Sequence, residues 1–252
     1  MNRTLSSPTS SQIIPSLNPT DWFERQVLQT TIEPATSSSA ISCFAPKCYE
    51  PGYAYPLIVW LHGPCNNEDE LPDVMSYIST RNHIAVAPRG TKRILGVPAA
   101  YGWDETADGI TEARERVDEC IAVAQQRFCI HPKRIFLAGH STGGTLACRL
   151  GLENPENYAG AISLSGRVPR GLRLLRNVNQ ARNLPLLLSV SPTVENYTTE
   201  TVMDDVRFLH AAGMSVDVRL YPDGDDLTNV MFRDLKRWVM EQFCPSCVKT
   251  AS

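Results

Sequence analysis

The chain has 252 residues, of which 42% are hydrophobic, and it carries a formal net charge of -3 with an isoelectric point near 6.0. A chain of this length can bury a full core, and α/β chains of this size often form one domain. The slightly acidic balance gives no sign of a basic face for nucleic acid or of a polybasic membrane-binding face, so nucleic acid is not an expected partner. No run approaches the roughly 20 apolar residues that a membrane span needs.

The first 20 residues are rich in Ser, Thr, Pro and Asn and lack the apolar segment of a secretory signal. We expect a disordered tail over residues 1–20, followed by a single domain over residues 21–252. Without a secretory signal, the expected location is the cytoplasm, where cysteines remain thiols.

The first half of the domain reads as strands with one short helix. Strand-like segments at 21–33 and 40–46 suggest an antiparallel pair at a sheet edge. The continuous apolar run at 56–61 predicts a central strand buried on both faces. The elements expected after it are a short helix at 69–80, a buried strand at 84–88 and a long loop at 89–108.

The second half alternates helices with strands. The expected elements are a helix at 109–128, a strand at 135–138, a helix after residue 141, a strand at 158–164, a short exposed helix carrying five arginines within 167–182, a strand at 184–190, a helix at 199–212 ended by Gly213, a strand at 216–220 and a helix at 229–243. This alternation requires a mostly parallel central sheet with helices on both faces.

The sequence Gly139-His-Ser-Thr-Gly143 joins the buried strand at 135–138 to the helix that follows. Glycines on both sides of Ser141 permit a sharp turn that exposes the serine hydroxyl and places the backbone N–H of Thr142 beside it. The alternative is an ordinary strand-to-helix turn in which Ser141 caps the helix. The pattern favours a serine nucleophile.

Three segments in chain order carry a family resemblance: Leu61-His-Gly63, Gly139-His-Ser-Thr-Gly143 and Tyr221-Pro-Asp-Gly224. Together they resemble the α/β-hydrolase superfamily, and within it the phospholipase/carboxylesterase branch of acyl-thioesterase-like and feruloyl-esterase-like enzymes. The resemblance implies an α/β-hydrolase fold, acyl-transfer chemistry without a cofactor, and Ser141 as nucleophile. It places an acid after the 184–190 strand, a histidine after the 216–220 strand, and an oxyanion hole at Thr142 and just after His62-Gly63.

The chain departs from this family pattern in three separate loops. Asp225 stands where the catalytic histidine is expected, and no histidine follows residue 210. Pro64 has no N–H at a position that usually donates to the oxyanion, so Cys65 is the remaining candidate donor. The acid loop offers only Glu195. Because an exposed aspartate is a far poorer base than histidine, the triad as a whole looks degenerate.

Two interpretations remain open. In the first, the protein is a catalytically impaired hydrolase that binds an ester-like small molecule or a protein partner in a pocket near His62, Pro64, Trp103 and His140. In the second, it is an active serine carboxylester hydrolase that uses Ser141 with a non-standard base. In this fold the turn directs His140 away from the serine, and the residue at position 62 is usually structural.

Eight cysteines raise a separate question. Cys43, Cys48, Cys244 and Cys247 could form a zinc knuckle if the C-terminal segment folds back, whereas unpaired thiols are the simpler interpretation. The acidic run at 223–226 lacks the spacing of a calcium loop and is expected to be a polar turn. No metal is therefore expected at the Ser141 site.

Overall fold

The computed structural model describes residues 28–32, 40–79, 81–171, 177–190, 197–222 and 227–243. The predicted tail at 1–20 lies outside these residues. The strands form one eight-stranded sheet in the order β1-β2-β4-β3-β7-β8-β9-β10, with a separate two-stranded hairpin of β5 and β6. β1 (Leu28–Ile32) pairs antiparallel with β2 (Ile41–Ala45), which pairs antiparallel with β4 (Ile84–Pro88). The antiparallel edge pair predicted from the sequence is thereby confirmed.

The remaining neighbours in the main sheet, from β4 to β10, are all parallel. β3 (Tyr55–Leu61), β8 (Gly160–Leu164) and β9 (Leu186–Val190) are buried along their whole length, as their continuous apolar sequences predict. β7 (Ile130–His140) is much longer than the expected four residues. β10 (Val216–Leu220) ends the sheet and is only partly buried.

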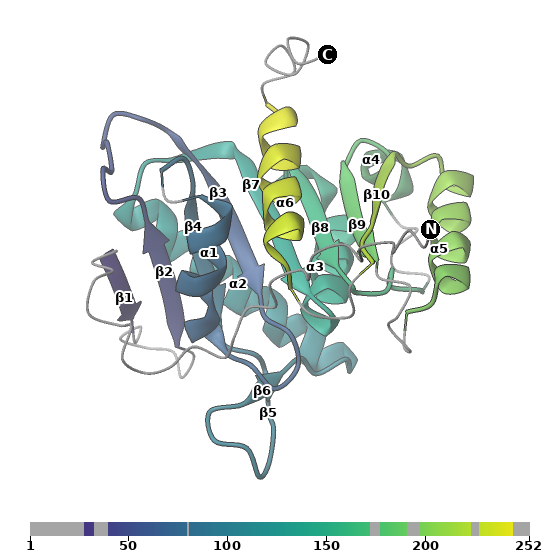
Figure 1. Ribbon diagram of the computed structural model, residues 1–252, viewed down its shortest axis with the longest axis horizontal. Helices are drawn as coiled ribbons and strands as arrows, with labels where there is room; N and C mark the ends of the chain where they lie inside the picture. Colours follow the sequence, from purple (N-terminus) through teal and green to yellow (C-terminus); the bar gives the residue numbers. More distant parts are fainter. Residues whose placement is uncertain are drawn as a thin grey trace, which may run out of the picture.

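Helices cover both faces of the sheet (Figure 1). α1 (Leu71–Ile78) and α6 (Asn229–Glu241) lie on the near face, where their apolar sides join Trp60 and Phe136 in one core cluster. α2 (Ala107–Arg127) and α3 (Thr142–Glu153) lie on the far face and pack on a second cluster around Val59 and Leu137. The arrangement is an α/β-hydrolase fold, as the sequence predicts.

Two predictions about irregular segments were wrong in part. The expected loop at 89–108 contains the hairpin of β5 (Lys92–Arg93) and β6 (Tyr101–Gly102), and α2 begins at Ala107. In the arginine-rich segment, residues 167–171 have no regular structure and helix is described only for α4 (Val178–Ala181). The N–H of Val168 donates to the Asp205 carboxylate instead of to a helical carbonyl, which fixes this segment as an irregular connection.

Among the residues that the structure describes, no helix is long and apolar enough to cross a membrane. α5 (Thr199–Ala211) ends as expected at Gly213, whose φ of 78° is the left-handed conformation that glycine adopts most easily.

Candidate active site

The turn between β7 and α3 has the geometry that its glycines predict. Ser141 adopts φ 50° and ψ −118°, its N–H donates to the carbonyl of Leu164 at 2.8 Å, and the N–H of Thr145 donates to its carbonyl at 3.0 Å. A Cβ atom on Gly139 would lie 2.5 Å from the carbonyl carbon of Gly143. A serine with positive φ at the junction of a buried strand and a helix has the backbone geometry of a nucleophile elbow, which makes Ser141 the candidate nucleophile.

Backbone strain gathers at this end of the sheet. The non-glycine residues with positive φ in the described ranges are Cys65, Ala99, Ser141 and Ser165. Cys65, Ser141 and Ser165 follow the C-terminal ends of β3, β7 and β8, and Ala99 lies in the hairpin joined to the loop after β3. Because each such conformation costs about 1–3 kcal/mol, their concentration at one edge marks that edge as the candidate functional site.

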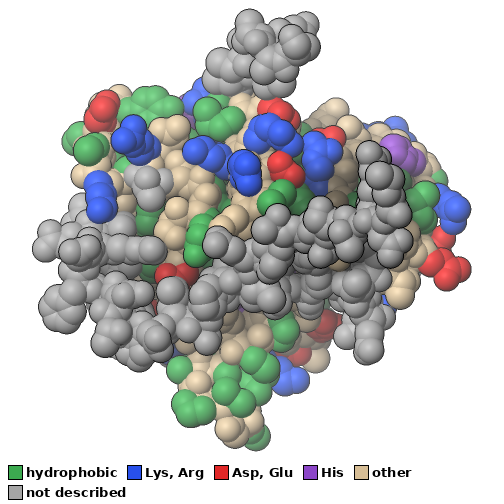
Figure 2. All heavy atoms as spheres, in the orientation of Figure 1, with side chains coloured by type: hydrophobic (Ala, Val, Ile, Leu, Met, Phe, Trp, Pro, Cys, Tyr) green, Lys and Arg blue, Asp and Glu red, His purple; other side chains and the backbone are tan. Residues whose placement is uncertain are grey.

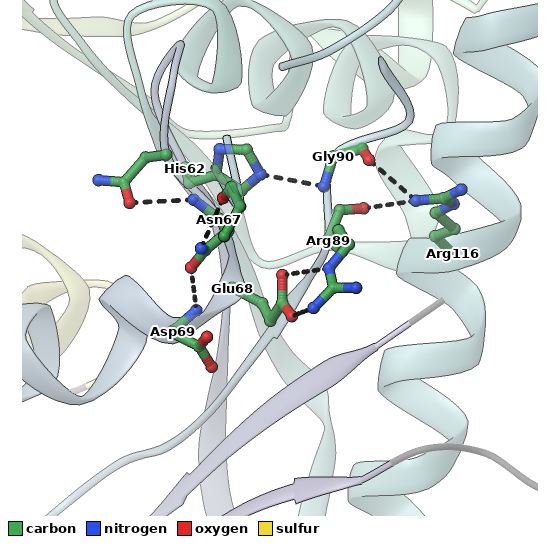
Figure 3. Close-up of polar contacts among 9 residues, drawn as sticks. His62, Asn67, Glu68, Asp69, Arg89, Gly90 and Arg116 are labelled. Atoms are coloured by element: carbon green, nitrogen blue, oxygen red, sulfur yellow. Dashed lines mark hydrogen bonds and ion pairs between the residues drawn. The ribbon is translucent and has the colours of Figure 1, made fainter. Parts of the chain in front are cut away.

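The loop after β3 is held from below by His62, which is fully buried. The Nδ1 atom of His62 lies 2.7 Å from the carbonyl oxygen of Gly63, and its Nε2 atom accepts from the N–H of Gly90 at 3.0 Å (Figure 3). This pairing requires a neutral ring protonated at Nδ1. Burial lowers the pKa of His62, in agreement with that form. Both ring nitrogens are therefore engaged in structure.

Trp103 completes this support. Its indole N–H donates to the carbonyl of His62 at 2.9 Å, and its ring lies 5.1 Å from the imidazole, centroid to centroid. Trp103 is 7% exposed. The side chains of His62 and Trp103, both predicted near the pocket, thus lie beneath the loop, whereas Pro64 and Cys65 at its crest are exposed.

A buried ion pair anchors the next segment of the same loop. Glu68 is fully buried, and both of its carboxylate oxygens accept from the guanidinium of Arg89, one of them at 2.9 Å from Nε. Arg116 on α2 donates to the backbone carbonyls of Arg89 and Gly90 at 2.8 and 3.0 Å. Figure 3 shows Glu68 and Arg89 facing one another between the 62–69 segment and α2. This network fixes the loop to the end of β4. No feature of the sequence distinguishes Glu68 from its acidic neighbours.

His140 does not approach the site as a free base. A Cβ atom on Gly63 would lie 2.7 Å from His140 Nδ1, so the imidazole rests against the loop after β3. The Glu70 carboxylate accepts from Trp60 Nε1 at 2.6 Å, and burial raises its pKa while His140 acts in the opposite direction. His140 is therefore electrostatically coupled to Glu70, which immediately precedes α1.

The other three histidines are remote. His83 precedes β4 and His131 is the second residue of β7, so both lie at the N-terminal ends of parallel strands, whereas Ser141 follows the C-terminal end of β7. His210 lies in the last turn of α5. Glu195 and Asp225, the predicted acid and the residue at the histidine position, lie outside the described residues.

A second buried carboxylate joins the segments that flank the acid loop. Asp205 on α5 is 2% exposed and accepts from the N–H of Val168 at 3.0 Å, from the hydroxyl of Tyr197 at 2.9 Å and from the guanidinium of Arg170 at 2.5 Å. Tyr197 directly follows the undescribed residues 191–196. Asp205 thus links α5 both to the connection that follows β8, through Val168, and to the connection that follows β9, through Tyr197.

One cavity of about 770 Å³ lies at the opposite edge of the sheet. Its lining includes Lys47, Tyr55 and Arg81, which precede or begin β3 and β4, together with Phe243 after α6. It is therefore separate from the Ser141 elbow.

The position of Cys43 in the core argues against the zinc-knuckle alternative. Cys43 is buried in the core cluster that also contains Cys120, and burial raises its pKa to about 11, whereas Cys48 is exposed. Within the described ranges, no group of His, Cys, Asp and Glu could hold a metal ion. Cys244 and Cys247 lie outside those ranges.

Comparison with known proteins agrees with the fold. The family model described as Phospholipase/Carboxylesterase matches residues 53–240, so the chain belongs to the phospholipase/carboxylesterase family of α/β-hydrolases. A probable carboxylesterase of Oryza sativa subsp. japonica is 29% identical over 162 residues, which cover 63% of this chain and 59% of that protein, less than two thirds of its length. A probable inactive carboxylesterase of the same species is 25% identical over 228 residues, covering 82% and 88%.

Among solved structures, a ferulic acid esterase superposes with a TM-score of 0.70 at 15% identity, covering 86% of this chain and 98% of the other. At this identity the likeness concerns the fold alone. It is consistent with the eight-stranded, mostly parallel sheet.

Proposed function

We propose that the chain is a carboxylesterase-like protein that binds an ester-like small molecule at Ser141 and turns it over far more slowly than a complete triad would. The observation that carries this proposal is the combination of an assembled elbow with no imidazole free to serve it. Ser141 has the strained conformation of a nucleophile, yet both nitrogens of His62 are engaged and His140 rests against Gly63.

The size of the expected defect follows from the role of the base. Removing the histidine of a serine-hydrolase triad lowers kcat by about 10⁶, and loss of one oxyanion donor costs about 10²–10³. Pro64 removes one such donor, and Cys65 beside it is the candidate replacement. The similarity to a protein named as a probable inactive carboxylesterase supports the same interpretation.

The alternative is an active serine carboxylester hydrolase with a non-standard base, and one observation favours it. The left-handed backbone of Ser141 costs free energy that a simple helix cap would not require. Selection for a reactive hydroxyl would explain why that strain persists.

Hydrolysis of short- and medium-chain p-nitrophenyl esters by the purified protein, with Ser141→Ala as the control, tests the proposal. We expect wild type and Ser141→Ala to hydrolyse these esters at nearly equal rates. A rate that depends on Ser141 and approaches that of ordinary esterases would establish the alternative. Binding of non-hydrolysable ester analogues, measured by calorimetry on both proteins, tests the ligand class independently of turnover. A protein with neither turnover nor analogue binding would point to a protein partner.

A cytoplasmic location remains part of the proposal. Its support is that the cysteines described in the structure are unpaired, including the exposed Cys48 and Cys65, as expected in a reducing compartment. Fractionation of cells carrying a tagged chain would test it.

A further inference from the structure

The cavity of about 770 Å³ lies at the edge of the sheet where the parallel strands begin, opposite the Ser141 edge. Cavities that hold drug-sized ligands have volumes of about 300–1,000 Å³, and a few polar groups stand among their apolar and aromatic walls. This cavity combines the aromatic rings of Tyr53, Tyr55 and Phe243 with two cationic side chains. Its size and lining are therefore those of a binding site for a small organic molecule.

The aromatic wall of the cavity is fixed in place. The rings of Tyr53 and Tyr55 meet edge to face, with their centroids 4.7 Å apart and an interplanar angle of 84°. The hydroxyl of the buried Tyr55 accepts from the N–H of Glu50 at 3.1 Å. Tyr53 remains 45% exposed, so part of its ring is uncovered. Flat aromatic groups pack best on such a surface, which indicates an aromatic body for the ligand.

The two cations of the cavity, Lys47 and Arg81, come from neighbouring segments of the sheet. Lys47 follows β2 and Arg81 precedes β4, and the antiparallel register of these strands brings the end of the first beside the start of the second. Neither cation forms an ion pair with any residue in the described ranges. Glu50 supplies the lining's carboxylate, so two positive charges and one negative charge leave the cavity positive.

Further positive charge surrounds the cavity. The guanidinium of Arg134 lies 4.7 Å from the ring centroid of Phe243. Lys236 on α6 helps to lower the pKa of His83 at the start of β4, which shows that its positive field reaches this edge. Figure 2 shows Lys and Arg side chains gathered in the upper half of the near face, toward the end of the molecule at which α6 ends in Figure 1. A cleft bordered by one sign of charge attracts ligands of the opposite sign.

We propose that this cavity binds a planar aromatic oxyanion, with its ring against Tyr53 and Phe243 and its anionic group held by Lys47 and Arg81. A guanidinium can donate two parallel hydrogen bonds to a carboxylate or a phosphate, and an ammonium adds a point charge, so both anions share this chemistry. Binding would also relieve the repulsion between the two unpaired cations. The ligand is distinct from the ester of the proposed function, because Ser141 lies at the other edge of the sheet.

Calorimetric titration of the full chain with 1-naphthyl phosphate, 1-naphthoate and neutral 1-naphthol tests the proposal. The three probes share one aromatic body and differ in the charged group. We expect at least one anion to bind about tenfold more tightly than 1-naphthol, and the tighter anion identifies a phosphate or a carboxylate as the natural group.

Two pairs of substitutions distinguish the cavity from net charge. Lys47→Gln with Arg81→Gln should remove the tenfold advantage of the anion and leave the affinity for 1-naphthol unchanged. Lys92→Gln with Arg93→Gln makes the same change of charge at exposed positions on the opposite edge, and should bind all three probes as wild type does. 

Two exposed cysteines locate the bound ligand. Cys48 lines the cavity, whereas Cys65 lies at the Ser141 edge. We expect a saturating concentration of the anion to slow alkylation of Cys48 by N-ethylmaleimide several-fold and to leave Cys65 unaffected, as measured by peptide mass spectrometry. Equal affinities of wild type for the anions and 1-naphthol, an unchanged anion affinity in the Lys47 and Arg81 variant, or alkylation of Cys48 that ignores the ligand would each overturn the proposal.

Discussion

His62 Nε2 accepts a hydrogen bond of 3.0 Å from the backbone N–H of Gly90, which joins the loop after β3 to the end of β4. The imidazole stands under the candidate oxyanion loop with its other nitrogen 2.7 Å from the carbonyl of Gly63. A histidine near a serine elbow is a candidate catalytic base. Here both nitrogens are committed to backbone groups, so the residue acts as a support for the loop.

Replacement of His62 should therefore affect folding more than chemistry. We expect His62→Phe to lower the free energy of unfolding by about 3 kcal/mol, because the buried N–H of Gly90 and carbonyl of Gly63 lose their partner. Urea denaturation followed by circular dichroism measures the change. His210→Phe, at an exposed position on α5, is the control and should change the free energy by less than about 0.5 kcal/mol. A His62→Phe protein as stable as wild type would contradict the supporting role.

The elbow itself makes a sharper steric prediction. A Cβ atom on Gly143 would lie 2.1 Å from the carbonyl oxygen of Leu61 and 2.5 Å from that of His62, both of them backbone atoms that cannot move alone. We expect Gly143→Ala to destabilise the protein by about 3 kcal/mol or more. Gly52→Ala, where no atom lies within 4 Å of the added Cβ, should change stability by less than about 1 kcal/mol. Equal thermal midpoints for the two variants would show that the elbow has another shape.

His83 makes stability depend on pH. It is fully buried with neither ring nitrogen hydrogen-bonded, and burial, reinforced by Lys236, lowers its pKa to about 4 from 6.5. Because the folded-state pKa is below the unfolded one, the stability contributed by the neutral ring is complete above pH 6.5 and is lost as pH falls toward 4. The difference corresponds to about 3 kcal/mol.

We expect His83→Leu to remove that loss, so that the free energy of unfolding of the variant falls less than that of wild type between pH 6.5 and 4. Urea titrations at several pH values measure both curves. The two curves would run parallel if the ring were protonated freely in the folded protein, and that result would refute the assignment.

Asp205 and Asp204 are neighbours on α5 with opposite environments. Asp205 is 2% exposed with three donors, whereas the Asp204 side chain is 60% exposed and pairs with Arg207 at 2.9 Å. We expect Asp205→Asn to cost about 2 kcal/mol of stability and Asp204→Asn less than about 0.5 kcal/mol. Thermal unfolding of both variants gives the comparison. Similar losses in both would mean that the buried carboxylate does not join the connections after β8 and β9.

The order of helices and strands followed from the sequence because each central strand is a continuous apolar run and each helix has one apolar side. The β5–β6 hairpin did not, since its strands have two residues each and depend on hydrogen bonds to Asn66 and Asn67 in a different loop. The Ser141 elbow was predictable because its glycines are required by contacts within a few residues of the turn and by the neighbouring strand.

The supporting carboxylates were not predictable. Glu68, Asp69 and Glu70 are adjacent in sequence, and only the fold shows that Glu68 meets Arg89 whereas Glu70 meets Trp60. Cys43 likewise resembled a metal ligand by its spacing from Cys48, but the pleat of β2 turns it into the core. Inward or outward direction at these positions is set by tertiary contacts with residues far along the chain.

The departures of the site from a complete triad predict a coupled rescue. Asp225→His would restore an imidazole at the expected position, and Pro64→Ala would restore a backbone N–H in the loop after β3. Because proton transfer and oxyanion stabilisation act on the same transition state, we expect each single variant to gain little and the double variant to gain more than the product of the single gains, by on the order of 10² in kcat/KM. Hydrolysis of p-nitrophenyl butyrate by the four proteins of the cycle, each also with Ser141→Ala, measures the coupling.

Gains that persist after Ser141→Ala would show that the new histidine acts without the elbow. No gain in the double variant would place the remaining defect in the acid loop. The next variant to test is then Glu195→Asp added to the double variant, because the family resemblance implies an aspartate in that loop.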